Sequence, residues 1–175
     1  MARIEFMSVP SEPDPISELA LDAEEATASV DLSEATILLV DDNLQNLELM
    51  QAYLEALPCA VHTAHDGVEA MEALAVHRPD LVLLDVMMPR MSGFEVCRRI
   101  KGNPQTRQTL VIMVTALNEV ADHERAVESG TDDFLSKPVN KLELLTRIRS
   151  LLRLSLLRRR LDRMVGRRDE GFGES

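Results

Sequence analysis

Polar side chains that could do chemistry stand directly after four short, mostly apolar runs. The runs and the residues that follow them are Thr36–Val40 with Asp41 and Asp42, Leu81–Leu84 with Asp85, Leu110–Val114 with Thr115, and Phe134–Ser136 with Lys137. Short apolar runs bounded by breakers are typical of strands buried on both faces of a sheet. In open α/β sheets, ligands bind in the crevice beyond the carboxyl ends of parallel strands. We therefore expect three acids, a hydroxyl and an amine at one edge of a parallel sheet.

The three acids predict a cation site at this edge. Carboxylates that lie close together repel one another unless a cation sits among them, and hard oxygen ligands favour Mg²⁺. Asp41, Asp42 and Asp85 are the candidate ligands, of which one or two bind directly and another acts through water. Because bound Mg²⁺ recruits phosphate oxygens, Asp85 could act as a nucleophile on phosphorus and form an aspartyl phosphate.

The transferred phosphoryl group would need its oxygens stabilised. Mg²⁺ serves one oxygen, Lys137 a second as a point charge, and Thr115 with a backbone amide near Ala116 a third. Each feature alone has a plainer explanation. An acid after a strand is often a turn former or a helix cap, a lone threonine there is structural, and Lys137-Pro138 is a turn. Only the whole set, in this order and spacing, indicates phosphoryl chemistry.

The composition excludes several classes of protein. The chain has 175 residues, a formal net charge of -11 and a pI of about 4.8. Phosphate contacts need a basic surface, so this acidity argues against nucleic-acid binding. No apolar run approaches the ~18 residues of a membrane span, so we expect no membrane contact. The spacing of Cys59 and Cys97 fits neither a metal site nor a redox motif, and we expect reduced thiols in a cytoplasmic protein.

Strand-like and helix-like segments alternate along the chain, and a further, weaker strand is expected at Ala60–Ala64. The expected helices are Asn43–Leu57, Gly67–His77, a third from Phe94 to near Gly102, Glu119–Ser129, and a long one from Asn140 to about Met164. Five strands alternating with five helices predict an α/β fold with a doubly wound, five-stranded parallel sheet. The natural candidate is the flavodoxin-like order 2-1-3-4-5, here with an extended C-terminal helix. No Gly-rich phosphate-binding loop follows the first strand.

Four motifs together resemble the receiver domain of two-component response regulators. They are Val40-Asp41-Asp42-Asn43, Leu84-Asp85-Val86-Met87-Met88-Pro89 with Met91 and Gly93, Val114-Thr115-Ala116, and Phe134-Leu135-Ser136-Lys137-Pro138. The resemblance covers about residues 35–155. It implies that Asp85 is the phospho-acceptor, that Asp42 ligates Mg²⁺ directly, and that Asp41 is its partner, often acting through water.

The resemblance also implies roles for other positions. Met87 matches the residue whose backbone carbonyl completes the metal site, and Lys137 matches the lysine of the family's active site. Thr115 matches the switch hydroxyl that moves toward the phosphoryl group, and Phe134 matches the switch aromatic. Pro138 matches a proline preceded by a cis peptide, so we expect a cis Lys137-Pro138 bond.

These roles imply a signalling module that is not an enzyme. It would accept a phosphoryl group on Asp85 from a sensor histidine kinase or phosphotransfer protein, and switch conformation or dimerisation to control a partner or output. A Mg²⁺-dependent phosphohydrolase with an aspartate nucleophile is an alternative. That family has a second acid two residues after the nucleophile, where this chain has Met87. A constitutive dimerisation scaffold that ignores phosphate is a further alternative.

The receiver-like part, residues 35–152, lies between two further segments. Residues 1–34 form an acidic, proline-containing tail that we expect to be disordered. Beyond the receiver, four large apolar residues follow 3-4-3 spacing: Leu154, Leu157, Leu161 and Met164. They predict a helical extension over residues 153–165, a possible coiled coil that forms a homodimer or leads to an output domain; a solvated helix is the plainer alternative. Residues 166–175 are expected to be a disordered tail.

Overall fold

A parallel sheet of five strands forms the centre of the fold in the computed structural model, which describes residues 30–116, 125 and 127–170 (of residues 164–170, the backbone alone). The strands are β1 Thr36–Val40, β2 Ala60–Ala64, β3 Leu81–Asp85, β4 Leu110–Thr115 and β5 Asp133–Ser136. Their order is β2-β1-β3-β4-β5, and every neighbouring pair is parallel. This confirms the doubly wound, flavodoxin-like sheet that the sequence predicted.

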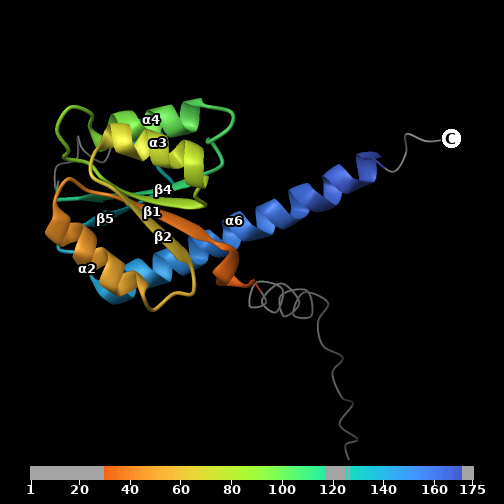
Figure 1. Ribbon diagram of the computed structural model, residues 1–175, viewed down its shortest axis with the longest axis horizontal. Helices are drawn as coiled ribbons and strands as arrows, with labels where there is room; N and C mark the ends of the chain where they lie inside the picture. Colours follow the sequence, from red (N-terminus) through yellow and green to blue (C-terminus); the bar gives the residue numbers. More distant parts are fainter. Residues whose placement is uncertain (1–29, 117–124, 126, 171–175) are drawn as a thin grey trace, which may run out of the picture. The chain divides into compact units, whose positions relative to one another are not determined.

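Helices cover both faces of the sheet. They are α2 Leu44–Leu54, α3 Gly67–His77, α4 Gly93–Gly102 and α6 Lys141–Glu170, and a short 3-10 helix, η1 Leu32–Glu34, precedes β1. Figure 1 shows α3 and α4 on one face, and α2 and α6 on the other. The helix expected at Glu119–Ser129 falls largely outside the described residues, although residues 125 and 127–129 are helical. Residues 1–29 of the expected tail also lie outside them. The prediction of disorder is wrong for the end of the tail, because residues 32–34 form η1 and Val30 is buried.

The sheet is buried because its central strands are apolar over residues 37–40, 81–84 and 110–114. Every residue of β3 and β4 is buried, and so are the last four of β1. The edge strand β2 is more exposed, in keeping with its weaker apolar pattern. Asp85 and Thr115 are the last residues of their strands. The fold therefore presents its polar groups at the carboxyl edge of the sheet.

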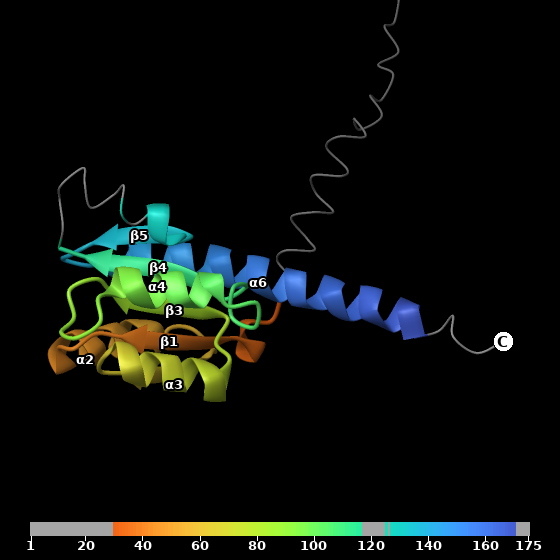
Figure 2. The same cartoon turned by 90° about the horizontal axis from the view of Figure 1, so that it is seen from above.

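α6 is longer than the sequence pattern predicted. The helix runs without a break to Glu170, whereas the pattern placed its end at about Met164 and the helical extension at residues 153–165. A single glycine costs a helix interior only about 1 kcal/mol relative to alanine, and Gly166 is followed by two arginines that favour helix. The C-terminal part of α6 continues past the end of the sheet (Figure 2). Within the described residues, no helix is long and apolar enough to cross a membrane.

Candidate functional site

Three carboxylates meet at the carboxyl edge of the sheet. Asp41 and Asp42 follow β1, Asp85 ends β3, and these two strands are neighbours in the sheet. One carboxylate oxygen from each residue lies within 4.8 Å of the others. Asp41 and Asp85 are buried, whereas Asp42 is exposed. The structure therefore brings the three acids together, as their places after the strands led us to expect.

Lys137 joins two of these acids. Its Nζ lies 2.8 Å from Asp85 Oδ1 and 3.0 Å from Asp41 Oδ2. The pairing of β4 with β5 positions it, because the Lys137 N–H donates to the Thr115 carbonyl at 2.7 Å. The peptide bond between Lys137 and Pro138 is cis, which confirms the sequence prediction. The ammonium group of the residue after β5 thus reaches one acid that follows β1 and another that ends β3.

The surroundings change the acidity of both partners in this ion pair. Burial raises the pKa of the Asp85 carboxyl above its ordinary value. The Lys137 ammonium lowers this pKa in part, and the negative charges of Asp41 and Asp42 raise it further. Burial lowers the pKa of Lys137, but its hydrogen bonds with Asp85 and Asp41 outweigh that effect, so its pKa is raised. Lys137 therefore stays protonated near neutral pH. When all three acids are ionised, one ammonium leaves two negative charges uncompensated.

This excess of two negative charges and the all-oxygen donor set fit Mg²⁺. Ligand oxygens about 2.1 Å from Mg²⁺ lie up to about 4.2 Å apart across an octahedron, so the 4.8 Å spread of the carboxylates needs only small side-chain movements. Both oxygens of Asp41 already accept hydrogen bonds, from the Asn43 N–H, the Asn46 amide and Lys137. Asp41 is therefore suited to act through a metal-bound water.

Thr115 and Met87 lie at the same edge. Thr115 ends β4 opposite Ser136 of β5 and is 8% exposed. Met87 belongs to the loop after β3 and is 64% exposed. The metal-binding role that the resemblance implies for Met87 uses its backbone carbonyl and not its exposed side chain.

The match to known proteins decides the family. Residues 37–149 match the family described as the response regulator receiver domain. The chain belongs to this family. It is 46% identical over 123 residues to the response regulator PleD of Caulobacter vibrioides, which covers 70% of this chain and 27% of that protein. It is 44% identical over 117 residues to the response regulator MprA of Mycobacterium tuberculosis, which covers 67% of this chain and 50% of that protein.

Solved receiver domains share the fold. The receiver domain of a signal transduction histidine kinase from Syntrophus aciditrophicus gives a TM-score of 0.64 at 36% identity, covering 67% of this chain and 89% of that one. The receiver domain of the sensor histidine kinase PA1611 from Pseudomonas aeruginosa gives 0.63 at 30% identity, covering 67% and 97%. That structure is described with a magnesium ion coordinated in its active site cleft. The present chain spans half or less of the length of the two curated relatives above.

Two residues support the receiver site without having been assigned a role from the sequence. Asn46, in the first turn of α2, donates its side-chain amide to both oxygens of Asp41 at 3.2 and 3.1 Å. Gly93 begins α4 where an added Cβ would lie 2.2 Å from the Asp85 carbonyl oxygen, and its N–H donates to the Val86 carbonyl at 3.0 Å. The sequence offers only weak local signals of these contacts. For Asn46 the signal is its place five residues after Asp41, and for Gly93 it is a glycine at the start of a helix.

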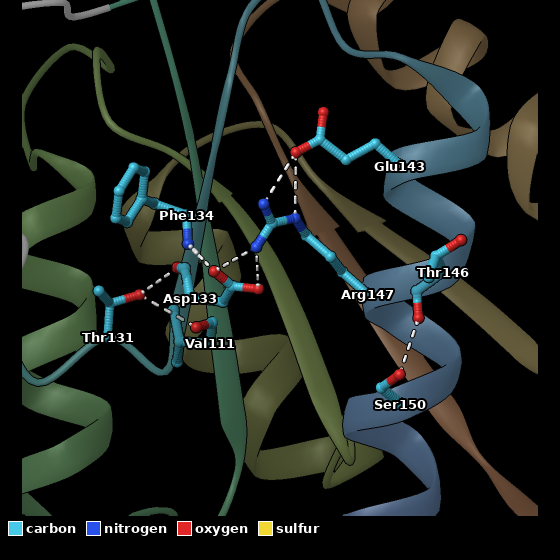
Figure 3. A network of polar contacts seen from close by, with 8 residues as sticks. All are labelled: Val111, Thr131, Asp133, Phe134, Glu143, Thr146, Arg147 and Ser150. Atoms are coloured by element: carbon cyan, nitrogen blue, oxygen red, sulfur yellow. Dashed lines mark hydrogen bonds and ion pairs between the residues drawn. The ribbon is translucent and has the colours of Figure 1, made fainter.

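The predicted switch aromatic lies on a strand that is tied to α6. Phe134 of β5 is half-buried and packs against the core cluster that contains Phe94. On the other side of β5, both carboxylate oxygens of Asp133 accept from Arg147 Nη1 at 2.8 Å (Figure 3). Arg147 also pairs with Glu143 at 2.9 Å. A change in the packing of Phe134 would therefore act on a strand that contacts α6 directly.

Proposed function

We propose that this receiver takes a phosphoryl group onto Asp85 from a phosphohistidine of a sensor histidine kinase or phosphotransfer protein. The position of Asp85 carries the proposal. Its buried carboxylate lies at the open edge of the sheet, 2.8 Å from the Lys137 ammonium and beside two further acids. A carboxylate in these surroundings can act as a nucleophile on phosphorus and can help to hold the cation that binds phosphate oxygens.

In the transfer, an Asp85 carboxylate oxygen forms a bond to phosphorus while the P–N bond to the donor imidazole breaks. The imidazole nitrogen released in this step takes a proton from solvent. Lys137 stabilises one phosphoryl oxygen as a point charge, since its ammonium group already contacts Asp85. Thr115 offers a hydroxyl from the end of the neighbouring strand β4.

Mg²⁺ fits the same site as the cofactor. Asp42 and Asp85 would bind it directly, Asp41 through water, and Met87 through its backbone carbonyl. When bound, Mg²⁺ neutralises charge on the phosphoryl oxygens and helps to place them for attack.

The phosphoryl group then acts as a local charge with a distant effect. It attracts the Thr115 hydroxyl and the Lys137 ammonium, which lie at the ends of β4 and β5. Movement of Thr115 opens room for Phe134, and Asp133, its neighbour in β5, carries the change to α6 through Arg147. A free-energy difference of only a few kcal/mol between the two states shifts their populations substantially.

A groove beside the site suits a protein donor. It has a volume of about 480 Å³ and lies between α2 and the segment that joins β5 to α6. Its lining is mainly apolar and is formed by Asn46, Leu49, Met50, Tyr53, Lys137, Pro138 and Val139. Lys137 lines the groove and also contacts Asp41 and Asp85. A protein bound in the groove could therefore present its phosphohistidine to Asp85.

The test is phosphorylation by phosphoramidate, a small donor whose P–N bond resembles that of phosphohistidine. We expect intact-mass spectrometry to detect one added phosphoryl group on the wild-type chain in Mg²⁺, and none in EDTA or on Asp85→Asn. Asp162→Asn, which removes an exposed acid on α6, is the matched control and should be modified like wild type. Equal modification of wild type and Asp85→Asn would refute the proposal.

The same preparations test the phosphohydrolase alternative. Position 87, two residues after Asp85, is a methionine and cannot donate a proton to a leaving group. We therefore expect no multiple-turnover release of phosphate from p-nitrophenyl phosphate. Sustained Mg²⁺-dependent release that is lost in Asp85→Asn would favour the hydrolase.

A further inference from the structure

An apolar stripe lies on the outer side of α6, beyond the receiver core. Leu154 is 49% exposed, Leu157 is half-buried and Leu161 is 61% exposed. Their spacing of three and four residues places them along one line of the helix. We call these three residues the leucine stripe. A continuous line of leucines, of which two are exposed and one is half-buried, differs from scattered surface leucines and is typical of a surface that binds another protein.

The opposite side of α6 is fixed to the domain, so the helix cannot rotate to bury the stripe. Leu152 and Leu156 are 0% and 2% exposed. Asp80, 6% exposed before the start of β3, accepts hydrogen bonds from Arg159 Nη1 at 2.8 Å and from Ser155 Oγ at 3.3 Å. Its other oxygen accepts from the Thr36 N–H at 3.0 Å. α6 is thus anchored to two strands of the sheet.

Arginines flank the leucine stripe on both sides. If Leu154 and Leu157 occupy positions a and d of a heptad, Arg153 and Arg160 take position g and Arg158 takes position e. Arg153 and Arg158 are exposed. The sole acid between residues 153 and 163 is Asp162, at position b, outside the positions that pair across an interface.

This charge pattern disfavours a second copy of the chain as the occupant of the stripe. In a parallel pair, position g of one helix faces position e of the other, so Arg153 would face Arg158 of the second copy. In an antiparallel pair, g faces g and e faces e, which again places arginine against arginine. Like charges at these positions select against self-pairing. The homodimer that the stripe suggested from the sequence alone is therefore the weaker expectation.

We propose that the leucine stripe is a docking surface for an acidic amphipathic helix of a partner protein. Apolar residues of that helix would cover Leu154, Leu157 and Leu161, as in other helix-in-groove or helix-pair contacts. Glu or Asp residues beside them would pair with Arg153, Arg158 and Arg160, since guanidinium groups bind carboxylates in a bidentate manner. The positive flanks are a local feature of a chain whose formal net charge is -11, so charge complementarity singles out this side of α6 for an acidic partner.

Two designed peptides of about 28 residues, long enough to form a helix, test the proposal with the full chain. Both carry leucine at 3-4 spacing; one has glutamate at the flanking positions and the other lysine. In fluorescence anisotropy without Mg²⁺ or a phosphoryl donor, we expect wild type to bind the glutamate peptide and not the lysine peptide. Arg153→Glu/Arg160→Glu should weaken glutamate-peptide binding by about tenfold or more, because attraction becomes repulsion, and should gain binding to the lysine peptide.

The matched control is Arg98→Glu/Arg107→Glu, which makes the same change in net charge at exposed sites on other parts of the surface. This variant should bind the glutamate peptide like wild type. Leu154→Ser/Leu161→Ser should lose binding, and because both leucines are exposed, its circular dichroism and melting temperature should stay close to wild type.

Three outcomes would overturn the proposal. The first is binding of neither peptide by wild type. The second is a wild-type dimer in light scattering that Leu154→Ser/Leu161→Ser abolishes, because the occupant would then be a second copy. The third is binding to phosphatidylserine vesicles that Arg153→Glu/Arg160→Glu abolishes while glutamate-peptide binding is unaffected, since the arginines would then serve a lipid surface.

Discussion

The ionised carboxylate of Asp85 lowers the stability of the folded state, because burial raises the pKa of this group. A carboxyl group whose pKa is higher in the folded than in the unfolded state binds protons more tightly when folded. As the pH rises from about 4, the usual value for an aspartate, the unfolded chain releases this proton first. The folded state therefore loses stability until the pH has passed the raised pKa, and the loss then stays constant.

Asp85→Asn should consequently be more stable than wild type near neutral pH in EDTA. The substitution keeps the shape of the side chain and removes the charge. The difference in melting temperature should shrink as the pH falls through the raised pKa of Asp85 and should vanish well below about 4, where the carboxyl is protonated in both states. Thermal unfolding followed by circular dichroism measures it, with Asp162→Asn, which removes an exposed acid outside the cluster, as the comparison. A variant less stable than wild type near pH 7 would mean that the Lys137 ion pair outweighs burial.

The reacting groups of the site could be predicted from the sequence, but not all of the residues that hold them in position. Asp85 and Lys137 could be predicted because each stands at or directly after the end of a strand, and parallel strands end at a common edge. Asn46 could not be predicted, because its contact with Asp41 depends on the angle at which α2 leaves β1. The need for glycine at position 93 depends on how closely α4 approaches the backbone of Asp85.

At the scale of elements, the sheet was predictable and the anchoring of α6 was not. Apolar runs separated by helical periodicity led to the strand order, because such alternation favours parallel βαβ units. The contact between Asp80 and Arg159 joins residues 79 positions apart, and no local pattern points to it. A periodicity of apolar residues showed that the last helix continues past the receiver, but it could not show which side faces the sheet.

We expect the contact between Asp80 and Arg159 to hold the second half of α6 against the domain. Arg159→Ala removes a hydrogen bond to a buried carboxylate, and we expect a loss of about 1–3 kcal/mol in the free energy of unfolding. Hydrogen exchange should rise most in α6 beyond Leu152, since the earlier part keeps the Arg147 contacts with Asp133. Arg158→Ala, at the exposed neighbouring position, is the matched control. Equal exchange in the two variants would show that the Asp80 contact does not hold the helix.

On the scale of the whole molecule, charge is unevenly distributed. The chain carries 30 acids against 19 lysines and arginines, yet residues 153–163 hold five arginines and one acid. Added salt of any kind will screen the repulsion among the acids and stabilise the fold to some extent. A specific Mg²⁺ effect must therefore be separated from general screening.

Mg²⁺ should stabilise the folded chain beyond this screening, because a ligand that binds only the folded state shifts the unfolding equilibrium. At 100 times its Kd the gain is about 2.7 kcal/mol, which for a chain of this size corresponds to roughly 5–10 °C in Tm. Thermal unfolding in MgCl₂ is compared with NaCl of equal ionic strength. Because Asp85→Asn lacks one ligand, it should gain little from Mg²⁺, so the order of stability in EDTA should reverse in Mg²⁺. If NaCl raised the Tm equally, or the variant gained as much as wild type, the acids would not form a Mg²⁺ site.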